Sequence, residues 1–246
     1  MKIAILSDIH GNLEAFLSVL DDIDRFKADA VVSLGDNIGY GGDSEAVMDI
    51  IISRNIMSVL GNHELACVNK RVYKWYTGDV KKAIDQALSS LSQASLAYLK
   101  GLETRLCKFE SRFVHGFPPD SVRHYLTQAG DDELHRTLSR QEEALCFVGH
   151  THKVRLVYAE DNTIQIKTPD RDTFDLTTGT KYIVNAGSVG QPRDGDPRAK
   201  YMIWDVSNQR LMIRRIPYDT RKAAEKIVAA GLPFKYARAV HPELTP

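Results

Sequence analysis

Four short segments of this sequence place side chains that can bind a metal ion directly after an apolar run. This recurrence limits the possible folds more than any other feature. The apolar runs have the length and the β-branched content of buried strands. Strands that end at one edge of a sheet bring residues far apart in sequence to a single site. The segments are Ser7-Asp8-Ile9-His10, Gly35-Asp36-Asn37, Gly61-Asn62-His63-Glu64 and Gly149-His150-Thr151-His152, with Val114-His115-Gly116 as a looser fifth member.

In the first half of the chain, strands alternate with helices, which is typical of a doubly wound α/β sheet. The expected strands are residues 3–6, 31–34, 58–60, 113–114 and 146–148. Leu13, Phe16, Leu17, Leu20 and Ile23 recur at helical spacing and predict a helix that packs one face on a sheet. Further helices are expected over residues 46–51, over 80–102 as one interrupted helix or a pair, and over 131–140.

The second half is richer in strands. Short alternating strands are expected at residues 155–159, 163–166, 181–184, 201–205 and 211–216, with turns that predict antiparallel hairpins. Asp219 or Thr220 can cap a last helix that ends at Gly231. Because no linker separates the halves, we expect one domain over residues 1–246, in which the second half forms a second sheet packed on the first.

Composition limits the partners and the compartment. Lys plus Arg and Asp plus Glu both number 32, so there is no net charge to gather nucleic acid or an anionic membrane. Cys67, Cys107 and Cys146 are far apart, which argues against disulfides or a thiolate zinc site and suits a reducing compartment. The apolar run after Met1 is too short for a signal peptide or a membrane span. We therefore expect a cytoplasmic protein without a membrane partner.

The polar residues of the motifs form a candidate set of metal ligands. Residues i and i+2 of an extended segment point the same way, so Asp8 and His10 are expected to hold one ion together, and His150 and His152 likewise. Asp36 can bridge two ions, and the Asn62 amide and the His115 imidazole complete the set. The full set is Asp8, His10, Asp36, Asn62, His115, His150 and His152.

The charge of this set favours phosphate chemistry. Two divalent ions bring four positive charges and the two carboxylates return only two, so a phosphate would neutralise the excess. Mixed nitrogen and oxygen ligation favours Mn²⁺, Fe²⁺, Co²⁺, Ni²⁺ or Zn²⁺ over Mg²⁺ or Ca²⁺. A bound ion lowers the pKa of its water to roughly 7 and so supplies a hydroxide nucleophile.

His63 and Glu64 have other expected roles. Because His63 directly follows Asn62, its side chain is expected to point away from the ion that Asn62 binds and toward the substrate. There it can protonate the leaving alkoxide. Glu64 is expected to orient a neighbouring group rather than to bind an ion.

Together these motifs resemble those of the calcineurin-like metallophosphoesterases, in the same order from residue 3 to residue 152. Gly39 and Gly41 after Asp36 belong to the resemblance, and residues 185–190 (Asn-Ala-Gly-Ser-Val-Gly) look like an element of its small prokaryotic members. The resemblance implies a four-layer α-β-β-α sandwich, in which two mixed sheets pack face to face between flanking helices.

The resemblance also implies two ligand sets and a catalytic acid. One metal site would use Asp8, His10, Asp36 and His152, and the other Asp36, Asn62, His115 and His150, with His63 as the acid. Ser/Thr protein phosphatases and symmetrically cleaving dinucleoside tetraphosphatases carry Asp-Arg where this chain has Gly39 and Tyr40. The small bacterial and archaeal phosphodiesterase-type members are therefore the better match.

The predicted function is hydrolysis of phosphate esters in a small phosphorylated molecule or nucleotide, with two divalent transition-metal ions, Mn²⁺ foremost. Arg193 is a candidate phosphate ligand. Trp75 and Tyr76 can wall a pocket or stack on a base, although ordinary packing explains them as well. Three further functions stay open: an asymmetric dinucleoside polyphosphate hydrolase, a nuclease, and a protein-binding scaffold without turnover. The sequence does not define the oligomeric state.

Overall fold

Two six-stranded sheets form the centre of the part of the chain that this computed structural model describes, residues 1–169 and 172–245. The strands are β1 (Lys2–Leu6), β2 (Ala30–Ser33), β3 (Met57–Ser58), β4 (Arg105–Lys108), β5 (Ser111–Val114), β6 (Leu145–Val148), β7 (Val154–Glu160), β8 (Thr163–Lys167), β9 (Thr173–Asp175), β10 (Tyr182–Ala186), β11 (Ala199–Asp205) and β12 (Arg210–Ile216). Sheet A has the order β3-β2-β1-β11-β12-β9, and sheet B the order β4-β5-β6-β10-β7-β8.

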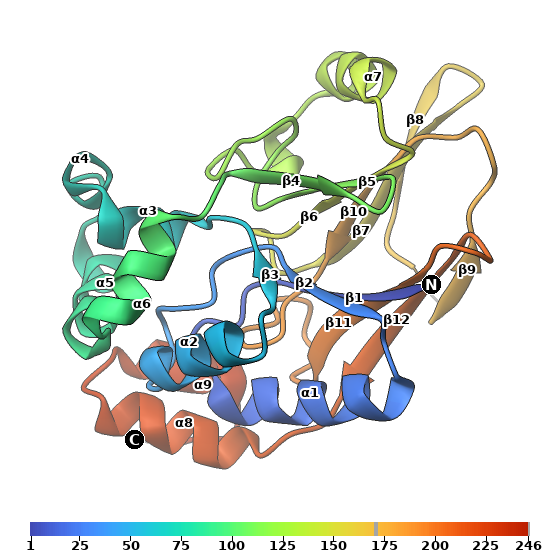
Figure 1. Ribbon diagram of the computed structural model, residues 1–246. Coiled ribbons are helices and arrows are strands. Elements are labelled where there is room, and N and C mark those ends of the chain that lie inside the picture. The colour runs from blue at the N-terminus through green and yellow to red at the C-terminus, as the bar shows by residue number, and fades with distance from the viewer. Residues whose placement is uncertain (170–171, 246) are drawn as a thin grey trace.

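Helices flank both sheets, so the predicted four-layer α-β-β-α sandwich is confirmed (Figure 1). The helices are α1 (Leu13–Phe26), α2 (Ser44–Ser53), α3 (Asn62–Val68), α4 (Lys70–Tyr73), α5 (Gly78–Ser90), α6 (Gln93–Lys100), α7 (Asp131–Arg140), α8 (Thr220–Ala229) and α9 (Phe234–Val240). Figure 1 shows α1, α2, α8 and α9 below the sheets, α7 above them and α3 to α6 at one end. None of the helices within the described ranges has both the length and the apolar character needed to cross a bilayer.

Strand β1 explains why these apolar runs do not alternate with polar residues. Ile3 and Ile5 pack between the two sheets, whereas Ala4 and Leu6 pack under α1 and α2 on the other face. Successive side chains of a strand point to opposite faces, so a strand that is covered on both sides must be apolar throughout. Sheet B is covered in the same way, with Leu134 and Leu138 of α7 packed on its outer face.

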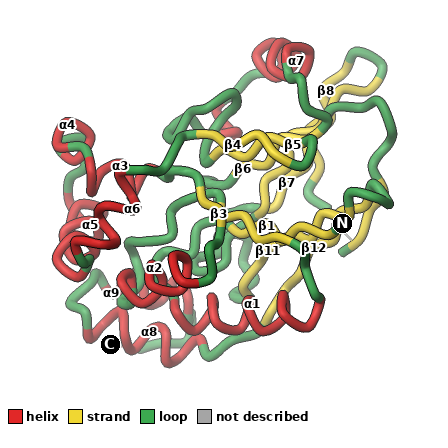
Figure 2. The backbone as a smooth tube through the Cα atoms, in the orientation of Figure 1, coloured by secondary structure: helices red, strands yellow, loops and turns green. Residues whose placement is uncertain are grey.

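The parallel strands direct their carboxyl ends to one side of the molecule. In sheet A, β1 is parallel to β2 and β2 to β3, and in sheet B, β6 is parallel to both β5 and β10. Figure 2 shows loops, in green, between the sheets and helices α2 and α3. All of the metal-type motifs lie in the loops or the helix that follow these strands.

The expectation that the second half of the chain builds its own sheet is wrong. Strands β7, β8 and β10 extend sheet B, whereas β9, β11 and β12 extend sheet A. The need to pair open strand edges explains this division. Without the antiparallel β11 beside it, β1 would expose a row of unpaired backbone donors and acceptors. Both sheets therefore contain strands from both halves.

One strand ends earlier than predicted, and the 80–102 region takes the second of its two predicted forms. The third strand ends at Ser58 rather than at residue 60, because α3 begins at Asn62 immediately after Gly61. The 80–102 region is a pair of helices, α5 and α6, that break where Ser92 caps α6 by accepting a hydrogen bond from the Ser95 N–H at 3.1 Å.

We predict that Phe147→Ala lowers the free energy of unfolding by about 3–5 kcal/mol, as loss of a buried phenylalanine does. Phe147 is fully buried between the sheets, and its ring stacks on Phe113 with 5.4 Å between centroids. Urea unfolding followed by circular dichroism measures the loss. Leu17→Ala is the control, because Leu17 is 49% exposed despite its place in the helical pattern. Equal midpoints for the two variants would contradict the core assignment.

Candidate metal centre

The loops after β1, β2 and β6 have an unusual backbone at the motif residues. Five non-glycine residues have positive φ angles, namely Asp8 (54°), His10 (51°), Asp36 (53°), His150 (66°) and His152 (59°). This conformation is costly for residues with a side chain and tends to cluster at functional sites. The extended geometry that the sequence suggested for these motifs is therefore wrong. Hydrogen bonds between the loops hold the observed conformation in place, including His10 N–H to the Asp36 carbonyl at 2.9 Å.

Asp8, His10 and His152 form the first group of facing polar atoms. His152 Nε2 lies 3.2 Å from Asp8 Oδ1 and 3.2 Å from His10 Nε2. His10 Nε2 lies 3.8 Å from the same carboxylate oxygen. The three side chains are at most 2% exposed, and their ligand atoms lie within 4.8 Å of one another. This group can hold a metal ion.

Asp36, His115 and His150 form a second group that can hold an ion. His115 Nε2 lies 3.3 Å from Asp36 Oδ2 and 3.1 Å from His150 Nδ1, and Asn62 Oδ1 approaches it to 3.0 Å. Asp36 Oδ2 also lies 3.8 Å from His10 Nε2 of the first group. The expectation that His150 and His152 share one ion is wrong, because they face different groups.

The outer nitrogens of the imidazoles are all bonded to backbone carbonyls, so the inner nitrogens are the ones that can bind an ion. His10 Nδ1 donates to Ile38 O at 3.0 Å, His115 Nδ1 to Leu34 O at 2.9 Å, His152 Nδ1 to Gln191 O at 2.6 Å, and His150 Nε2 to Arg123 O at 3.1 Å. A neutral imidazole has one proton, so each inner nitrogen presents a lone pair. Lone pairs that face each other at 3.1 to 3.2 Å fit a bound cation.

The pKa values of His10, His150 and His152 agree with neutral, ligand-ready imidazoles, whereas that of His115 is raised. Burial lowers the pKa of His150 to about 3 and those of His10 and His152 well below the usual range. Burial opposes ionisation of Asp36, but the imidazoles of His115 and His63 hold its pKa well below its usual range. Against burial, the Asp36 charge raises the pKa of His115 to about 9. A proton on His115 thus takes the position beside Asp36 that a cation would fill.

Glu64 fixes the loop that carries Asp36, as the sequence predicted for it. It lies in the first turn of α3, and its fully buried carboxylate accepts hydrogen bonds from the backbone N–H groups of Asp36 at 2.9 Å, Asn37 at 2.6 Å and Gly61 at 3.1 Å. Asp36 Oδ1 in turn accepts from His63 N–H at 2.9 Å. A Cβ atom at Gly61 would collide with Asp36, which accounts for the glycine before α3.

His63 borders the cluster on the side of His10 and Asp36. Its Nε2 lies 4.0 Å from Asp36 Oδ2, and its ring contacts His10 and Tyr40 with centroid distances of 4.9 and 4.6 Å. Its Nδ1 is buried and has no hydrogen-bond partner among the described residues. Gly39 lies against this nitrogen, where a side chain would collide with the ring.

Residues 185–193 pass beside the first group and bring Arg193 to its rim. Ser188 Oγ donates to the Asp8 carbonyl at 2.8 Å, and Gly190 N–H donates to it at 3.0 Å. The guanidinium of Arg193 lies 5.9 Å from the centroid of the Tyr40 ring. Tyr40 itself packs on His10 at 4.5 Å. The structure thus places Arg193 close to the other predicted site residues.

Sequence reasoning missed Tyr125 at this site and Lys200 beside the segment that carries Arg193. Tyr125 stacks on His150 with 3.8 Å between ring centroids, and Lys200, only 1% exposed, pairs with Asp194 at 3.0 Å beside the Arg193 segment. Neither lies in a motif or a regular pattern that would signal it. Tyr76 contacts Asn62 through a 3.1 Å hydrogen bond, whereas Trp75 is 52% exposed and stacks on Arg123.

Comparison with known proteins places these features in a family context. Residues 1–209 match the family model described as the calcineurin-like phosphoesterase superfamily domain. An uncharacterized protein of Methanocaldococcus jannaschii is 32% identical over 237 residues, or 94% of this chain and 93% of that protein. The crystal structure of a metallophosphoesterase from Sphaerobacter thermophilus is similar with a TM-score of 0.84 at 30% identity, covering 98% of each chain.

A shorter match adds a second kind of relative. The symmetrical bis(5'-nucleosyl)-tetraphosphatase of Wigglesworthia glossinidia brevipalpis is 45% identical over 64 residues. These residues make up 25% of this chain and 24% of that protein.

We predict that Glu64→Gln lowers the free energy of unfolding by about 1–3 kcal/mol, because the new amide nitrogen leaves a buried backbone N–H without an acceptor. Chemical denaturation in the presence of a chelator measures this loss without a contribution from metal binding. Glu142→Gln is the matched control, since Glu142 is exposed at the surface and should change stability by less than about 0.5 kcal/mol. A Glu64→Gln variant as stable as the control would show that the carboxylate does not fix the loop.

Proposed function

The chain belongs to the calcineurin-like phosphoesterase superfamily and is a phosphoesterase hydrolase; from this premise we propose that residues 1–246 form one catalytic domain with a two-metal centre. Its substrate would be a small phosphorylated molecule or a nucleotide. The observation that carries the proposal is the position of Asp36 Oδ2, which lies 3.3 Å from His115 and 3.8 Å from His10 and so faces both groups.

In this proposal the two groups are the two metal sites. Asp8, His10, Asp36 and His152 would hold one ion, and Asp36, Asn62, His115 and His150 the other. A divalent transition metal suits this mixture of imidazole, carboxylate and amide, with Mn²⁺ foremost, followed by Fe, Co, Ni or Zn. Bound ions would supply a nucleophile from water at neutral pH and neutralise charge on the phosphoryl group.

His63 would move the proton that the leaving group needs. Its ring lies at the edge of the cluster, where burial lowers the pKa of the imidazole and the charge of Asp36 opposes that effect. Protonation of an alkoxide matters most where the leaving group is a strong base. Gly39 has no side chain that could contact the buried Nδ1, and this nitrogen has no hydrogen-bond partner among the described residues. Within those residues, therefore, no carboxylate holds the ring from that side.

Arg193 would bind the non-bridging oxygens of the phosphate. The two carboxylates leave a surplus of positive charge once two cations are bound, and Arg193 adds to it at the rim. A guanidinium can make two parallel hydrogen bonds to a phosphate. The ring of Tyr40 beneath it supports its position.

Hydrolysis of dinucleoside polyphosphates is the second candidate function. The partial likeness to a symmetrical tetraphosphatase favours it, and Tyr76, Tyr125 and the exposed Trp75 offer ring faces for a base near Asn62 and His150. Gly39 and Tyr40 stand where the symmetrical enzymes carry Asp-Arg, so asymmetric cleavage of dinucleoside tetraphosphate to a nucleoside triphosphate and a monophosphate is the expected outcome. Chromatography of the products separates the two modes.

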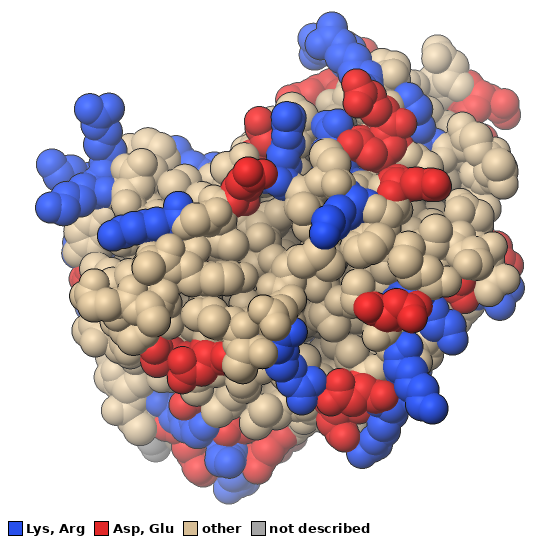
Figure 3. Space-filling view, in the orientation of Figure 1, with Lys and Arg blue, Asp and Glu red and all other residues tan. Residues whose placement is uncertain are grey.

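A nuclease and a scaffold without turnover have less support. A nuclease needs a basic track for the phosphate backbone, whereas Lys and Arg are interspersed with Asp and Glu on the face in Figure 3. A scaffold would have no need of His63 beside a complete ligand set. Cys67, Cys107 and Cys146 are free thiols, which supports the cytoplasmic location that we propose.

We predict that His63→Ala lowers kcat by about 10²–10⁴-fold in Mn²⁺-loaded protein while two equivalents of metal remain bound. The loss should be larger for phenyl than for p-nitrophenyl esters, because p-nitrophenolate leaves without a proton. Turnover of both diesters and metal analysis of the same samples test this. His135→Ala, which changes a histidine of α7, is the control.

Two results would count against this proposal. An equal loss for both leaving groups would remove His63 as the proton donor. Wild-type protein that stays inactive with every one of the five metals would refute the two-metal hydrolase itself.

We predict that Arg193→Ala raises KM about tenfold or more with little change in metal content, because it removes a charge-assisted hydrogen bond worth about 1.5–3 kcal/mol. Arg198→Ala is the matched control, since Arg198 is exposed in the same segment and pairs with Asp196 at 2.6 Å. Steady-state kinetics on bis(p-nitrophenyl) phosphate distinguishes the two variants. Identical KM values in both would exclude a phosphate contact by Arg193.

A further inference from the structure

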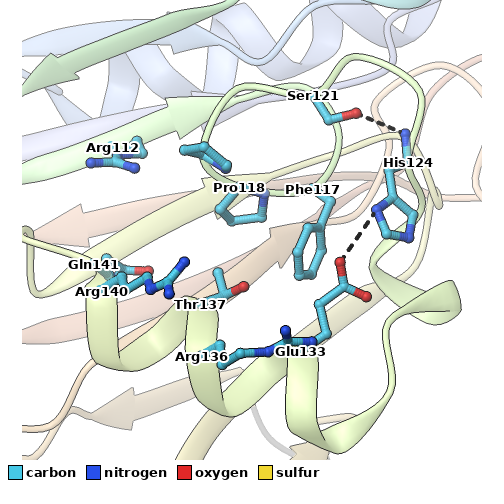
Figure 4. A pocket seen from close by; sticks show the side chains of 11 residues that line it. Arg112, Phe117, Pro118, Ser121, His124, Glu133, Arg136, Thr137, Arg140 and Gln141 are labelled. Atoms are coloured by element: carbon cyan, nitrogen blue, oxygen red, sulfur yellow. Dashed lines mark hydrogen bonds and ion pairs between the residues drawn. The ribbon is translucent and has the colours of Figure 1, made fainter.

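A pocket of about 460 Å³ lies on the outer side of sheet B, apart from the metal centre. Helix α7 forms one wall, and the segment from Phe117 to His124 forms the other (Figure 4). Phe117, Pro118 and Pro119 make its apolar surface. Its volume lies in the range of small-molecule sites. We call it the α7 pocket.

Basic side chains outnumber acidic ones in the α7 pocket. Arg112 is paired with Glu143 at 3.0 Å, and His124 with Glu133 at 3.8 Å across the pocket. Arg136 and Arg140 of α7 also line it, and neither has an acidic partner within 4.0 Å among residues 1–169 and 172–245. Arg136 Nε donates to the Asp132 carbonyl at 3.1 Å, which leaves its terminal nitrogens and the Arg140 guanidinium available to an anion.

Gln141 adds a buried acceptor to the same pocket. Its side chain is only 3% exposed, and its Nε2 donates to the backbone carbonyls of Glu143 at 2.8 Å and Tyr182 at 3.2 Å. These two bonds fix the amide orientation and leave Oε1 buried without a partner among the described residues. Figure 4 shows this oxygen on the side of Arg140 and Thr137. A buried acceptor without a donor costs free energy that a ligand N–H or O–H would recover.

We propose that the α7 pocket binds a small anion that has a flat apolar group and an N–H or O–H donor, a description that nucleoside monophosphates meet. The anionic group would lie on Arg136 and Arg140, the flat group on Phe117 and Pro118, and the donor on Gln141 Oε1. The inference stands apart from the proposed reaction, because these residues belong to neither candidate metal group.

Occupation of the α7 pocket can reach the metal centre through the loop between them. The pocket wall continues from His124 into Arg123, whose carbonyl accepts the hydrogen bond from His150 Nε2 at 3.1 Å, and into Tyr125, which stacks on the same ring. The His124–Glu133 pair joins this loop to α7. One loop therefore joins the α7 pocket to His150 of the second group.

Amide hydrogen exchange on the metal-loaded protein tests the proposal, with the non-hydrolysable phosphonate analogue of AMP as the probe. At ten times its dissociation constant, the probe should slow exchange over residues 131–141 by about tenfold. Replacing both arginines, Arg136→Ala with Arg140→Ala, should abolish this protection and leave turnover without probe within about twofold of wild type. Arg238→Ala, at an exposed arginine of α9, should keep the protection.

Three outcomes would overturn the proposal. Protection confined to the metal-site loops would place the probe at the catalytic centre only. Protection of residues 131–141 that survives the double substitution would remove the arginines as the anion ligands. Inorganic phosphate that protects this segment as strongly as the probe would show a plain anion site without selection for a flat group.

Discussion

The mutual repulsion of imidazole lone pairs is the constraint on which the rest of this structure depends. Each outer nitrogen is committed to a backbone carbonyl, so the inner nitrogens of His10 and His152 face each other at 3.2 Å, and those of His115 and His150 at 3.1 Å. Such pairs need a positive charge beside them, which a proton or a metal ion can supply. The positive φ angles of the loops and the buried Glu64 carboxylate fix the loop conformation. They therefore hold the imidazole rings in positions that only a cation stabilises.

Much of the fold could be predicted from the apolar patterns, because strands covered on both faces are apolar throughout and α1 has a clear helical stripe. The pairing of the later strands could not be predicted, because the sequences of β11 and β7 do not indicate which strand each of them pairs with. Their partners depend on which edge of each sheet is unpaired. Short elements such as α4 and β9 also escaped prediction, because three or four residues hold too little periodicity.

The residues of the candidate site could be predicted as a set, but not their geometry. The motifs identified every member of the two groups, whereas i,i+2 spacing paired His150 with His152 and the structure separates them. The reason is local, because both residues have positive φ and the alternation of an extended strand does not apply to them. Tyr125 contributes by position alone, from a segment that carries no recognisable pattern.

The pairing of β1 with β11 has a consequence for how the chain folds as it is synthesised. Lys2 aligns with Asp205, so the open side of β1 is closed only after the much later strand β11 has been made. Contacts between residues so distant in sequence slow folding, and an open strand edge is prone to association with other chains in the meantime. The nascent chain therefore exposes the carboxylate and imidazole of the first motif, with sheet A incomplete, until β11 has been synthesised.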